Sequence, residues 1–539
     1  MNRVNSKLGL HFGFLVAFST FMVGVWMLPM LLAGFPFVLS GTVLDAKEFA
    51  QTGLVGGLKP MVAVIIRILS SVVGWNNAVG WPLVTSITMA LSLFPLWWSV
   101  QRLFDSRIAW LTVVIFSFMP IQWLQALYAG GYPFALLFLF LGFAFFLYFY
   151  QQSTVKAILL FAIFFGFTLA SSHAFITFLP WICCAYILHN RFQWKSAIVQ
   201  AGMFCVVAYV GLMLPLVPNA LQQDMNTKER FAVFLPAVGE HTTGVGHLYP
   251  DYYAYEFLRE EFDQRILERT ADAHFLTRQQ DKYVHWIFGV GDMNFFDGLL
   301  NGGWLFLHTF PELLLQEYLG GAFLWIFIIL GMMYCFQAKR SFLFHFISLW
   351  ICMELILRFV LHYGRTHLMD IGWGFALFAG VGIATFCDAI APSFKRISSI
   401  GWSVIIVVIV SIQLTQANRT LFAHKYARSN VPAIFAATES LNALPEDAVV
   451  AHFDKGPLFY FSDRKHVRIH IDTIDYLIEQ GELGDPFIHY GVTHILGYDA
   501  DRTAQILKTV PDIKILTVPE EGEGVAVTPV IRYLLHLIR

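Results

Sequence analysis

Charged residues directly after the first apolar segment are the first candidates for chemistry. The stretch "GTVLDAKEFAQTGLVGGLKP" (41–60) contains Asp45, Glu48 and Lys59. Asp45 and Glu48 are three residues apart, so their carboxylates share one face if this stretch is helical. A carboxylate beside apolar residues can have a raised pKa, which suits a general base that takes a proton from a hydroxyl. The pair could instead bind a divalent cation, or cap and solvate an interfacial helix.

Lys59 is a candidate for binding a phosphate group. An ammonium at the membrane boundary can bind a lipid phosphate as a compact point charge. The residue precedes Pro60 and the run "MVAVIIRILSSVVG" (61–74), which is too short to span a bilayer and carries Arg67 near its middle. This pattern predicts an amphipathic helix in the membrane interface. In the alternative interpretation, the Lys59 side chain only extends from apolar surroundings to water.

A third group of ionisable residues lies late in the chain, in "ELILRFVLHYGRTHLMD". Glu354 and Arg358 are four residues apart in a predicted span, where charged side chains usually face a protein interior or a watery cavity. Arg365 and His367 follow in a short loop. Arg358, Arg365 and His367 could together bind a phosphate. A structural ion pair between Glu354 and Arg358 is the alternative.

Other motifs add little. His241 and His247 occur in "EHTTGVGHLYPDYY" (240–253) and are weak candidates for metal ligands or acid–base groups. The sequence contains no HExxH, GxxxxGK[ST], GxSxG or CxxC motif. The 6 cysteines all fall in apolar segments, which argues against a disulfide framework. No cofactor is therefore firmly predicted, and a divalent metal ion stays an open alternative.

The composition sets the class of protein. Of the 539 residues, 57% are hydrophobic and only 13% are charged, whereas soluble chains carry about 25% charged residues. The sequence therefore predicts a polytopic α-helical membrane protein. A net charge of −2 gives no basic excess and argues against nucleic acid as a partner.

The elements that must position these residues are apolar helices. A spanning helix needs about 20 mostly apolar residues, and about eleven such runs are present. The first is expected to be a retained signal-anchor helix, because its apolar run is too long for a cleaved signal peptide. The expected spans are 9–33, 79–99, 108–127, 133–150, 157–172, 174–189, 197–217, 319–337, 342–361, 371–387 and 398–415.

The distribution of Lys and Arg predicts the orientation. Basic residues in short loops favour the cytoplasm, and those near the span ends fall on one side if the N-terminus is cytoplasmic. Residues 1–416 then form a transmembrane domain with outer loops at 34–78 and 218–318. The outer loop 218–318 is expected to contain a second interfacial helix, at 302–321.

The tail from 417 to 539 has a different pattern. Apolar runs "AVVAHF", "VRIHI", "THILGY" and "IKILTV" alternate with helical stretches such as "DRTAQILKTV". This alternation predicts a small α/β domain, and the orientation of the spans places it outside the cytoplasm.

These features together resemble the GT-C glycosyltransferases. The nearest subgroup is the bacterial family similar to the protein O-mannosyltransferases and the aminoarabinose transferase of lipid A. The resemblance rests on Asp45 after the first span, on Lys59-Pro60 before an interfacial helix and on an outer loop containing Arg365. The tail segment "LPEDAVVAHFDKGPLFYFSDR" also looks like the external domain of that family.

The resemblance implies a function. Members transfer a sugar from a polyprenyl phosphate to an acceptor glycan, lipid or protein on the outer face of the membrane. Asp45 would then be the catalytic base, with Glu48 as its nearest acidic neighbour, and Lys59, Arg358, Arg365 and His367 would bind the lipid phosphate. The expected location is the bacterial inner membrane, with the tail in the periplasm or outside the cell.

One departure from the family pattern supports a different function. Ala46 stands where the family has a second acidic residue next to the aspartate. The alternative is therefore a non-catalytic GT-C-like subunit that acts as a scaffold in an envelope complex. Its partners would then include other membrane proteins.

Overall fold

The structure is a computed structural model, and not every residue of the chain is described below. The described residues are 2–33, 46, 55, 59–74, 80–127, 130–149, 153–172, 175, 178–179, 194–221, 322–337, 369–390, 397–418, 440–452, 464–468, 484, 487–488, 491–496, 500–510 and 512–516. All statements about structure refer to these residues.

The chain divides into two compact units, and each is described by itself. The first unit comprises Met1–Pro29, Pro82–Pro215 and Phe275–Ala427. The second comprises Met30–Trp81, Leu216–His274 and Arg428–Arg539.

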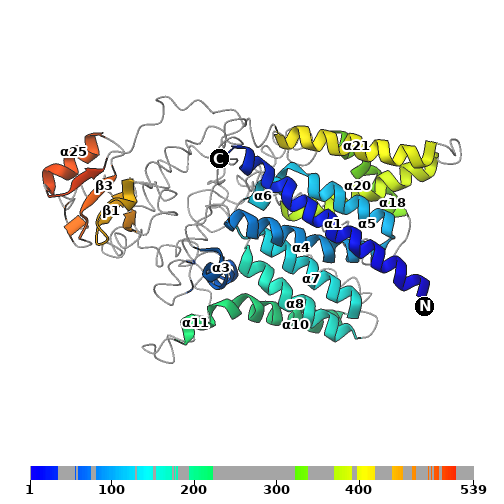
Figure 1. Ribbon diagram of the computed structural model, residues 1–539. Coiled ribbons are helices and arrows are strands. Elements are labelled where there is room, and N and C mark those ends of the chain that lie inside the picture. Colours follow the sequence, from blue (N-terminus) through cyan, green and yellow to red (C-terminus); the bar gives the residue numbers. More distant parts are fainter. Residues whose placement is uncertain are drawn as a thin grey trace, which may run out of the picture. The chain divides into compact units, whose positions relative to one another are not determined.

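Apolar helices dominate the first unit (Figure 1). Among the described residues, six helices are long and apolar enough to cross a membrane, or seven if one bent pair counts as a single span. The chain is an integral membrane protein. The helices are α1 (Asn2–Ala33), α4 (Gly80–Leu103), α5 (Ser106–Phe118), α6 (Pro120–Leu127), α7 (Tyr132–Phe149), α8 (Thr154–Ser171), α10 (Trp194–Met213), α18 (Ala322–Gln337), α20 (Met369–Ile390) and α21 (Ile397–Asn418).

These helices lie at nine of the expected spans. The expected spans 174–189 and 342–361 fall almost entirely outside the described residues, as does the expected interfacial helix at 302–321. The total of about eleven spans therefore remains a prediction. After α10 the chain continues through a 3₁₀ turn, Leu214–Leu216, into the short helix α11, Val217–Ala220.

Side-chain caps explain where two of the helices begin. Asp105 precedes α5 and accepts a hydrogen bond from the backbone N–H of Ile108 at 2.9 Å. Ser153 precedes α8 and accepts one from Lys156 N–H at 3.4 Å. Both acceptors satisfy an N–H that has no partner within its own helix.

Glycines allow α8 and α10 to approach closely. A Cβ on Gly166 would lie 2.7 Å from the Cα of Gly211, and a Cβ on Gly211 would lie 2.6 Å from the carbonyl oxygen of Ile163. Close contact through small residues is a common way for helices to pack in lipid. Phe161 and Phe204 fill the adjoining space, with ring centroids 5.6 Å apart.

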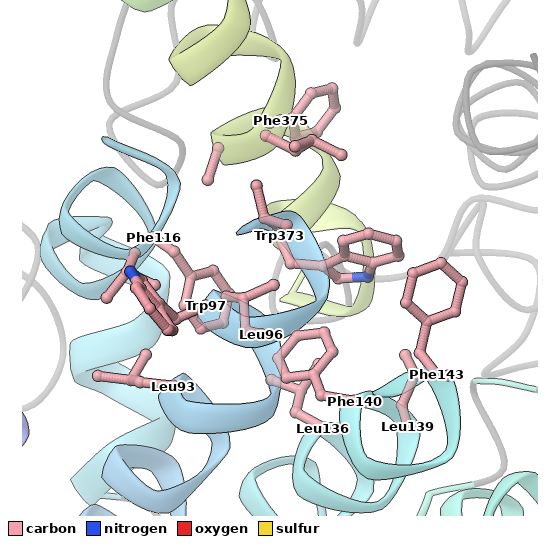
Figure 2. Packing of buried hydrophobic residues seen from close by; sticks show 14 of the residues in the cluster. Leu93, Leu96, Trp97, Phe116, Leu136, Leu139, Phe140, Phe143, Trp373 and Phe375 are labelled. Carbon is pink, nitrogen blue, oxygen red and sulfur yellow. The ribbon is translucent and has the colours of Figure 1, made fainter. Parts of the chain in front are cut away.

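The buried core of the first unit is aromatic where α20 meets α7. Trp373 of α20 lies against Phe140 and Phe143 of α7, with ring centroids 5.8 Å and 6.4 Å apart (Figure 2). The Trp373–Phe140 pair has an edge-to-face arrangement, which aromatic rings favour. These contacts fix the first turns of α20 against the bundle.

A parallel sheet forms the C-terminal part of the second unit. Its strands are β1 (Val449–His452), β2 (Lys465–Arg468), β3 (His494–Leu496) and β4 (Lys514–Leu516), in the order β2-β1-β3-β4. All described pairings are parallel, and helix α25 (Ala500–Thr509) connects β3 to β4. The strands lie at or next to the four apolar runs of the tail. The placement of residues 417–539 in one extracytoplasmic domain remains a prediction.

Candidate functional site

Lys59 is the N-cap residue of helix α3 (Pro60–Val73) in the second unit, directly before its first helical residue. Its carbonyl oxygen accepts hydrogen bonds from the N–H groups of Val62 at 3.0 Å and Ala63 at 3.1 Å. Pro60 occupies the first helical position, where a residue without an N–H is favoured. These backbone bonds hold the half-buried Lys59 at the N-terminus of α3.

A lysine is electrostatically unfavourable at this position. The N-terminus of a helix carries a partial positive charge, so a cation there costs about 0.3–1 kcal/mol, before any reduction for solvent screening. The first turn of α3 contains no acidic residue that would offset this charge. An anion bound beside Lys59 would be attracted by both the ammonium and the helix N-terminus.

Helix α3 has one buried face and one exposed face, as its sequence predicts. Val62, Ala63 and Ile66 are buried, whereas Ile68 and Val72 are 66% and 86% exposed. The helix ends at Gly74, where a φ of 82° favours glycine. Exposed apolar side chains beside the exposed Arg67 suit a helix at a membrane surface. Its position in the interface remains a prediction.

Most of the predicted site residues lie outside the described part of the chain: Asp45, Glu48, His241, His247, Arg358, Arg365 and His367. The structure therefore does not test whether they come together with Lys59. Ala46, which replaces the second acidic residue of the family pattern, is described and is fully buried. Its small apolar side chain suits this packed position.

The first unit has a second unusual feature, which the sequence analysis missed. The expected span 108–127 is two helices, α5 and α6, bent by 62° at Met119 and Pro120. Pro120 has no N–H to donate to the carbonyl of Phe116, so the α-helical bonding of α5 stops there. The N–H of Met119 is shared between the carbonyls of Ile115 at 3.1 Å and Phe116 at 3.3 Å.

Side chains from other helices satisfy the backbone near this break. The indole N–H of Trp26 in α1 donates to the carbonyl of Ser117 at 3.1 Å. The amide of Gln413 in α21 donates to the carbonyl of Ile115 at 3.3 Å. Broken helices persist at membrane depth when neighbouring groups bond the freed backbone in this way.

The end of α6 is held by α4. The hydroxyls of Thr85 and Ser86 both donate to the carbonyl of Ala126, at 2.7 Å and 3.0 Å. Three helices from distant parts of the sequence thus hold the α5–α6 break in place. Such a break is a specific structure that this sequence encodes, and broken helices in membrane proteins commonly line ligand sites.

Several buried polar atoms at the break have no hydrogen-bond partner within the described residues, among them Ser117 Oγ, Trp123 Nε1 and both polar atoms of Gln122. Gln122, in the first turn of α6, has no exposed surface. Within the described part of the chain, neither its Oε1 nor its Nε2 has a hydrogen-bond partner. The residue lies beside Gly372 of α20, since a Cβ built there would be 3.2 Å from Gln122 Nε2.

An ion pair joins α5 and α20 at the end of α20 that lies away from Gln122 and Gly372. Arg107 donates two hydrogen bonds to the carboxylate of Asp388, at 2.8 Å and 2.6 Å. Nearer the middle of both helices, Gly380 of α20 lies against Thr112 of α5, since a Cβ built on Gly380 would be 3.0 Å from Thr112 Oγ1. Helices α5 and α20 therefore run antiparallel, and Gln122 of α6 lies beside Gly372 near the end of α20 that is opposite to Asp388.

Two signals in the sequence could have indicated the break. Pro120 lies inside an apolar run, and Gln122 and Gln125 are polar residues within an expected span. Proline breaks helices, and polar groups in a span usually have a function or a partner. Gln413 is likewise a polar residue within an expected span, whereas Trp26 carries no comparable signal.

Comparison with known proteins identifies the fold. No family model matches the chain, and no curated protein matches it. Solved structures do match, and they show that the chain shares its fold with an archaeal oligosaccharyltransferase and with ArnT.

Two matching structures cover most of the chain. The oligosaccharyltransferase AglB from Archaeoglobus fulgidus, in complex with an inhibitory peptide and a dolichol-phosphate, has a TM-score of 0.54 and 11% identity, over 94% of this chain and 69% of AglB. ArnT from Cupriavidus metallidurans, bound to undecaprenyl phosphate, has a TM-score of 0.53 and 12% identity, over 94% of this chain and 90% of ArnT. Identities this low establish the fold alone.

A metal site is not visible in the described residues. Among them, no group of three His, Cys, Asp or Glu side chains could hold a metal ion. The A. fulgidus enzyme has also been solved with zinc and sulfate; that structure has a TM-score of 0.50 and 12% identity, over 83% of this chain and 62% of that one. The weak metal candidates Asp45, Glu48, His241 and His247 all lie outside the described residues.

Proposed function

We propose that this protein is a glycosyltransferase that moves a sugar from a polyprenyl-phosphate carrier to an acceptor on the outer face of the bacterial inner membrane. The observation that carries the proposal is the fold, which the chain shares over 94% of its length with ArnT bound to undecaprenyl phosphate. Lys59 supports it, because a cation held at a helix N-terminus is suited to a lipid phosphate.

The proposed reaction inverts the configuration of the sugar. Asp45 takes the proton of the acceptor hydroxyl, and the hydroxyl oxygen attacks the anomeric carbon. The bond between that carbon and the phosphate oxygen breaks, and polyprenyl phosphate leaves with its electron pair. Lys59 and Arg365, with Arg358 and His367, stabilise the charge that develops on the phosphate. Glu48 assists as a second carboxylate, and the sugar and acceptor are not specified by these residues.

Replacing Asp45 by Asn tests this assignment. The variant D45N keeps the size of the side chain but removes the base, so transfer should fall by about 100-fold or more. The measurement is transfer from labelled polyprenyl-phosphate sugars to lipid extracts by the full chain in membranes. D512N is the matched control, because Asp512 is exposed near β4 and far in sequence from the expected site. Equal transfer by D45N and the wild type would refute the role of Asp45.

A scaffold subunit is the second candidate function, and the buried Ala46 favours it. In that case the chain would copurify with other membrane proteins of an envelope complex. D45N would then leave the complex and the envelope phenotype unchanged. If D45N still assembles into an intact complex but no longer supports the wild-type envelope phenotype, a purely structural role is excluded.

A further inference from the structure

The buried amide of Gln122 requires an explanation that the fold does not supply. An amide taken out of water without hydrogen-bond partners destabilises the folded state. Trp26, Gln413, Thr85 and Ser86 donate hydrogen bonds to backbone carbonyls around the break. Several buried side-chain atoms there lack partners within the described residues, and Gln122 stands out among them because both polar atoms of its amide are unpartnered.

Helix α20 covers the amide with a residue that has no side chain. Among the described residues, the atoms within 4 Å of where a Cβ on Gly372 would be are Gln122 Nε2 at 3.2 Å and Met119 Sδ at 3.7 Å. Gly372 is in the first turn of α20, directly before Trp373. Access to the amide would require this turn, together with Trp373, to move away from α6 and α7; the ion pair lies at the other end of α20.

The chemistry of the segment favours a neutral ligand. Helix α6, "PIQWLQAL", contains no charged residue, whereas phosphate sites normally use cationic donors. A glutamine amide offers both donors and an acceptor, as a sugar hydroxyl does. The neighbouring Trp123 adds a buried indole N–H that also has no partner within the described residues.

We infer that Gln122 is a sugar-binding residue, whose amide bonds a hydroxyl of the sugar when the first turn of α20 moves away from α6. The sugar is the one attached to the polyprenyl phosphate, so this inference depends on the proposed function. The ligand-free protein keeps the amide buried and unpaired, and the sugar supplies the missing partners. A structural glutamine with no ligand is the competing explanation.

Binding of two kinds of lipid by the full chain in nanodiscs tests the inference. The probes are undecaprenyl phosphate and undecaprenyl phosphates that carry a pentose, a hexose or an amino sugar. The wild type should bind at least one sugar-bearing lipid more tightly than the bare lipid. The variant Q122M, which keeps the side-chain length but removes the amide, should reduce that preference by about tenfold, as expected for lost hydrogen bonds. Its affinity for bare undecaprenyl phosphate should not change.

Q200M is the matched control. Gln200 in α10 is half-buried and bonds Ser196 at 3.2 Å, so its replacement also removes an amide from the bundle. Q200M should keep the preference of the wild type. Without lipid, Q122M should also unfold at a higher temperature than the wild type, because an unpaired buried amide has been removed.

Hydrogen exchange of the wild type gives a test that needs no variant. The backbone amides of the first two turns of α20 should change their exchange with the sugar-bearing lipid and not with the bare lipid. An unchanged preference in folded Q122M, or identical exchange with both lipids, would overturn the inference and leave the proposed function standing. A wild type that binds no polyprenyl phosphate would overturn both.

Discussion

Gly331 of α18 and Gly382 of α20 face each other across the closest helix contact described in the first unit. A Cβ on Gly331 would lie 3.0 Å from the backbone nitrogen of Gly382 and would overlap the carbonyl of Phe378. A Cβ on Gly382 would lie 2.9 Å from the nitrogen of Gly331 and would overlap the carbonyl of Phe327. The two backbones therefore touch, and α20 is held by α18 on one side and by α5 on the other.

Replacing either glycine by Ala should separate α18 from α20. The added methyl has no space, so G331A and G382A should each destabilise the protein by about 1–3 kcal/mol, as other overpacked contacts do. The measurement is thermal unfolding in detergent. Gly202 in α10 is the control, because a Cβ there meets nothing within 4 Å. G202A should be neutral or slightly stabilising, since Ala favours helices more than Gly. Similar losses in all three variants would contradict the proposed contact.

The Arg107–Asp388 ion pair should contribute only modestly to stability. The two side chains are 43% and 58% exposed, so water screens their attraction. Exposed pairs are typically worth about 0–1 kcal/mol, and the two-bond geometry places this one toward the upper end. A double-mutant cycle of R107A and D388A should give a coupling free energy below about 1 kcal/mol. The coupling should weaken in high salt. A coupling well above that range would mean that the pair is shielded from water.

Trp26 and Trp97 provide a direct measure of the bonding at the α5–α6 break. Both are buried, but only Trp26 donates its indole N–H, to the carbonyl of Ser117. The indole N–H of Trp97 has no partner within the described residues. W26F and W97F remove the same side-chain volume. W26F should lower the free energy of unfolding by about 1–3 kcal/mol more than W97F, because it leaves the carbonyl of Ser117 without this donor. Thermal unfolding of both variants measures the difference. Equal losses would show that the break does not depend on this bond.

The sequence predicts the apolar helices well because each carries its own signal. A run such as 133–150 is long and continuously apolar, and α7 lies almost exactly over it, at Tyr132–Phe149. The cap at Asp105 is also local, since it depends on residues three apart in sequence. Local patterns of this kind are sufficient to place elements along the chain.

The arrangement at the α5–α6 break could not be predicted in the same way. Gln413 and Ile115 are 298 residues apart in sequence, and their hydrogen bond exists only after α21 has packed on α5. Pro120 indicates a break, but the partners of the freed carbonyls depend on tertiary structure. The acidic residues Asp45 and Glu48 remain predictions, because they lie outside the described residues.

The stability of the C-terminal sheet should depend on pH through His494. Burial lowers the pKa of His494 below its usual 6.5, and the nearby charge of Lys514 lowers it further. Lys514 is the register partner of His494 on β4, and Thr493 Oγ1 lies 2.8 Å from its Nδ1. The unfolded chain therefore binds a proton more readily than the folded one. The contribution of the neutral imidazole is present above pH 6.5 and is lost as the pH falls through the lowered pKa.

The variant H494Q tests this pH dependence. It removes the titrating group, so the fall in unfolding temperature of the full chain between pH 7.5 and pH 5.5 should be smaller than in the wild type. His494 is partly exposed, so the difference should be small. Hydrogen exchange of β3, corrected for the intrinsic pH effect, should locate the change to the sheet. A steeper loss at low pH in H494Q would mean that the protonated imidazole is stabilising.

Lys59 should stabilise a bound phosphate at the cost of its own helix. In K59Q the cation no longer opposes the helix dipole, an interaction that is typically worth about 0.3–1 kcal/mol. The same change should weaken binding of undecaprenyl phosphate by about tenfold or more, since a hydrogen bond to a charged group is worth about 1.5–3 kcal/mol.

Lys156 supplies the control for Lys59. It lies in the first turn of α8 and is exposed. K156Q should relieve the same unfavourable interaction with a helix dipole, but it should leave lipid binding unchanged. Unfolding temperatures and lipid titrations of the two variants therefore separate a functional lysine from one that only extends to water. If K59Q and K156Q behave alike in both measurements, Lys59 does not bind the phosphate, and the charge that stabilises the leaving group must come from other residues.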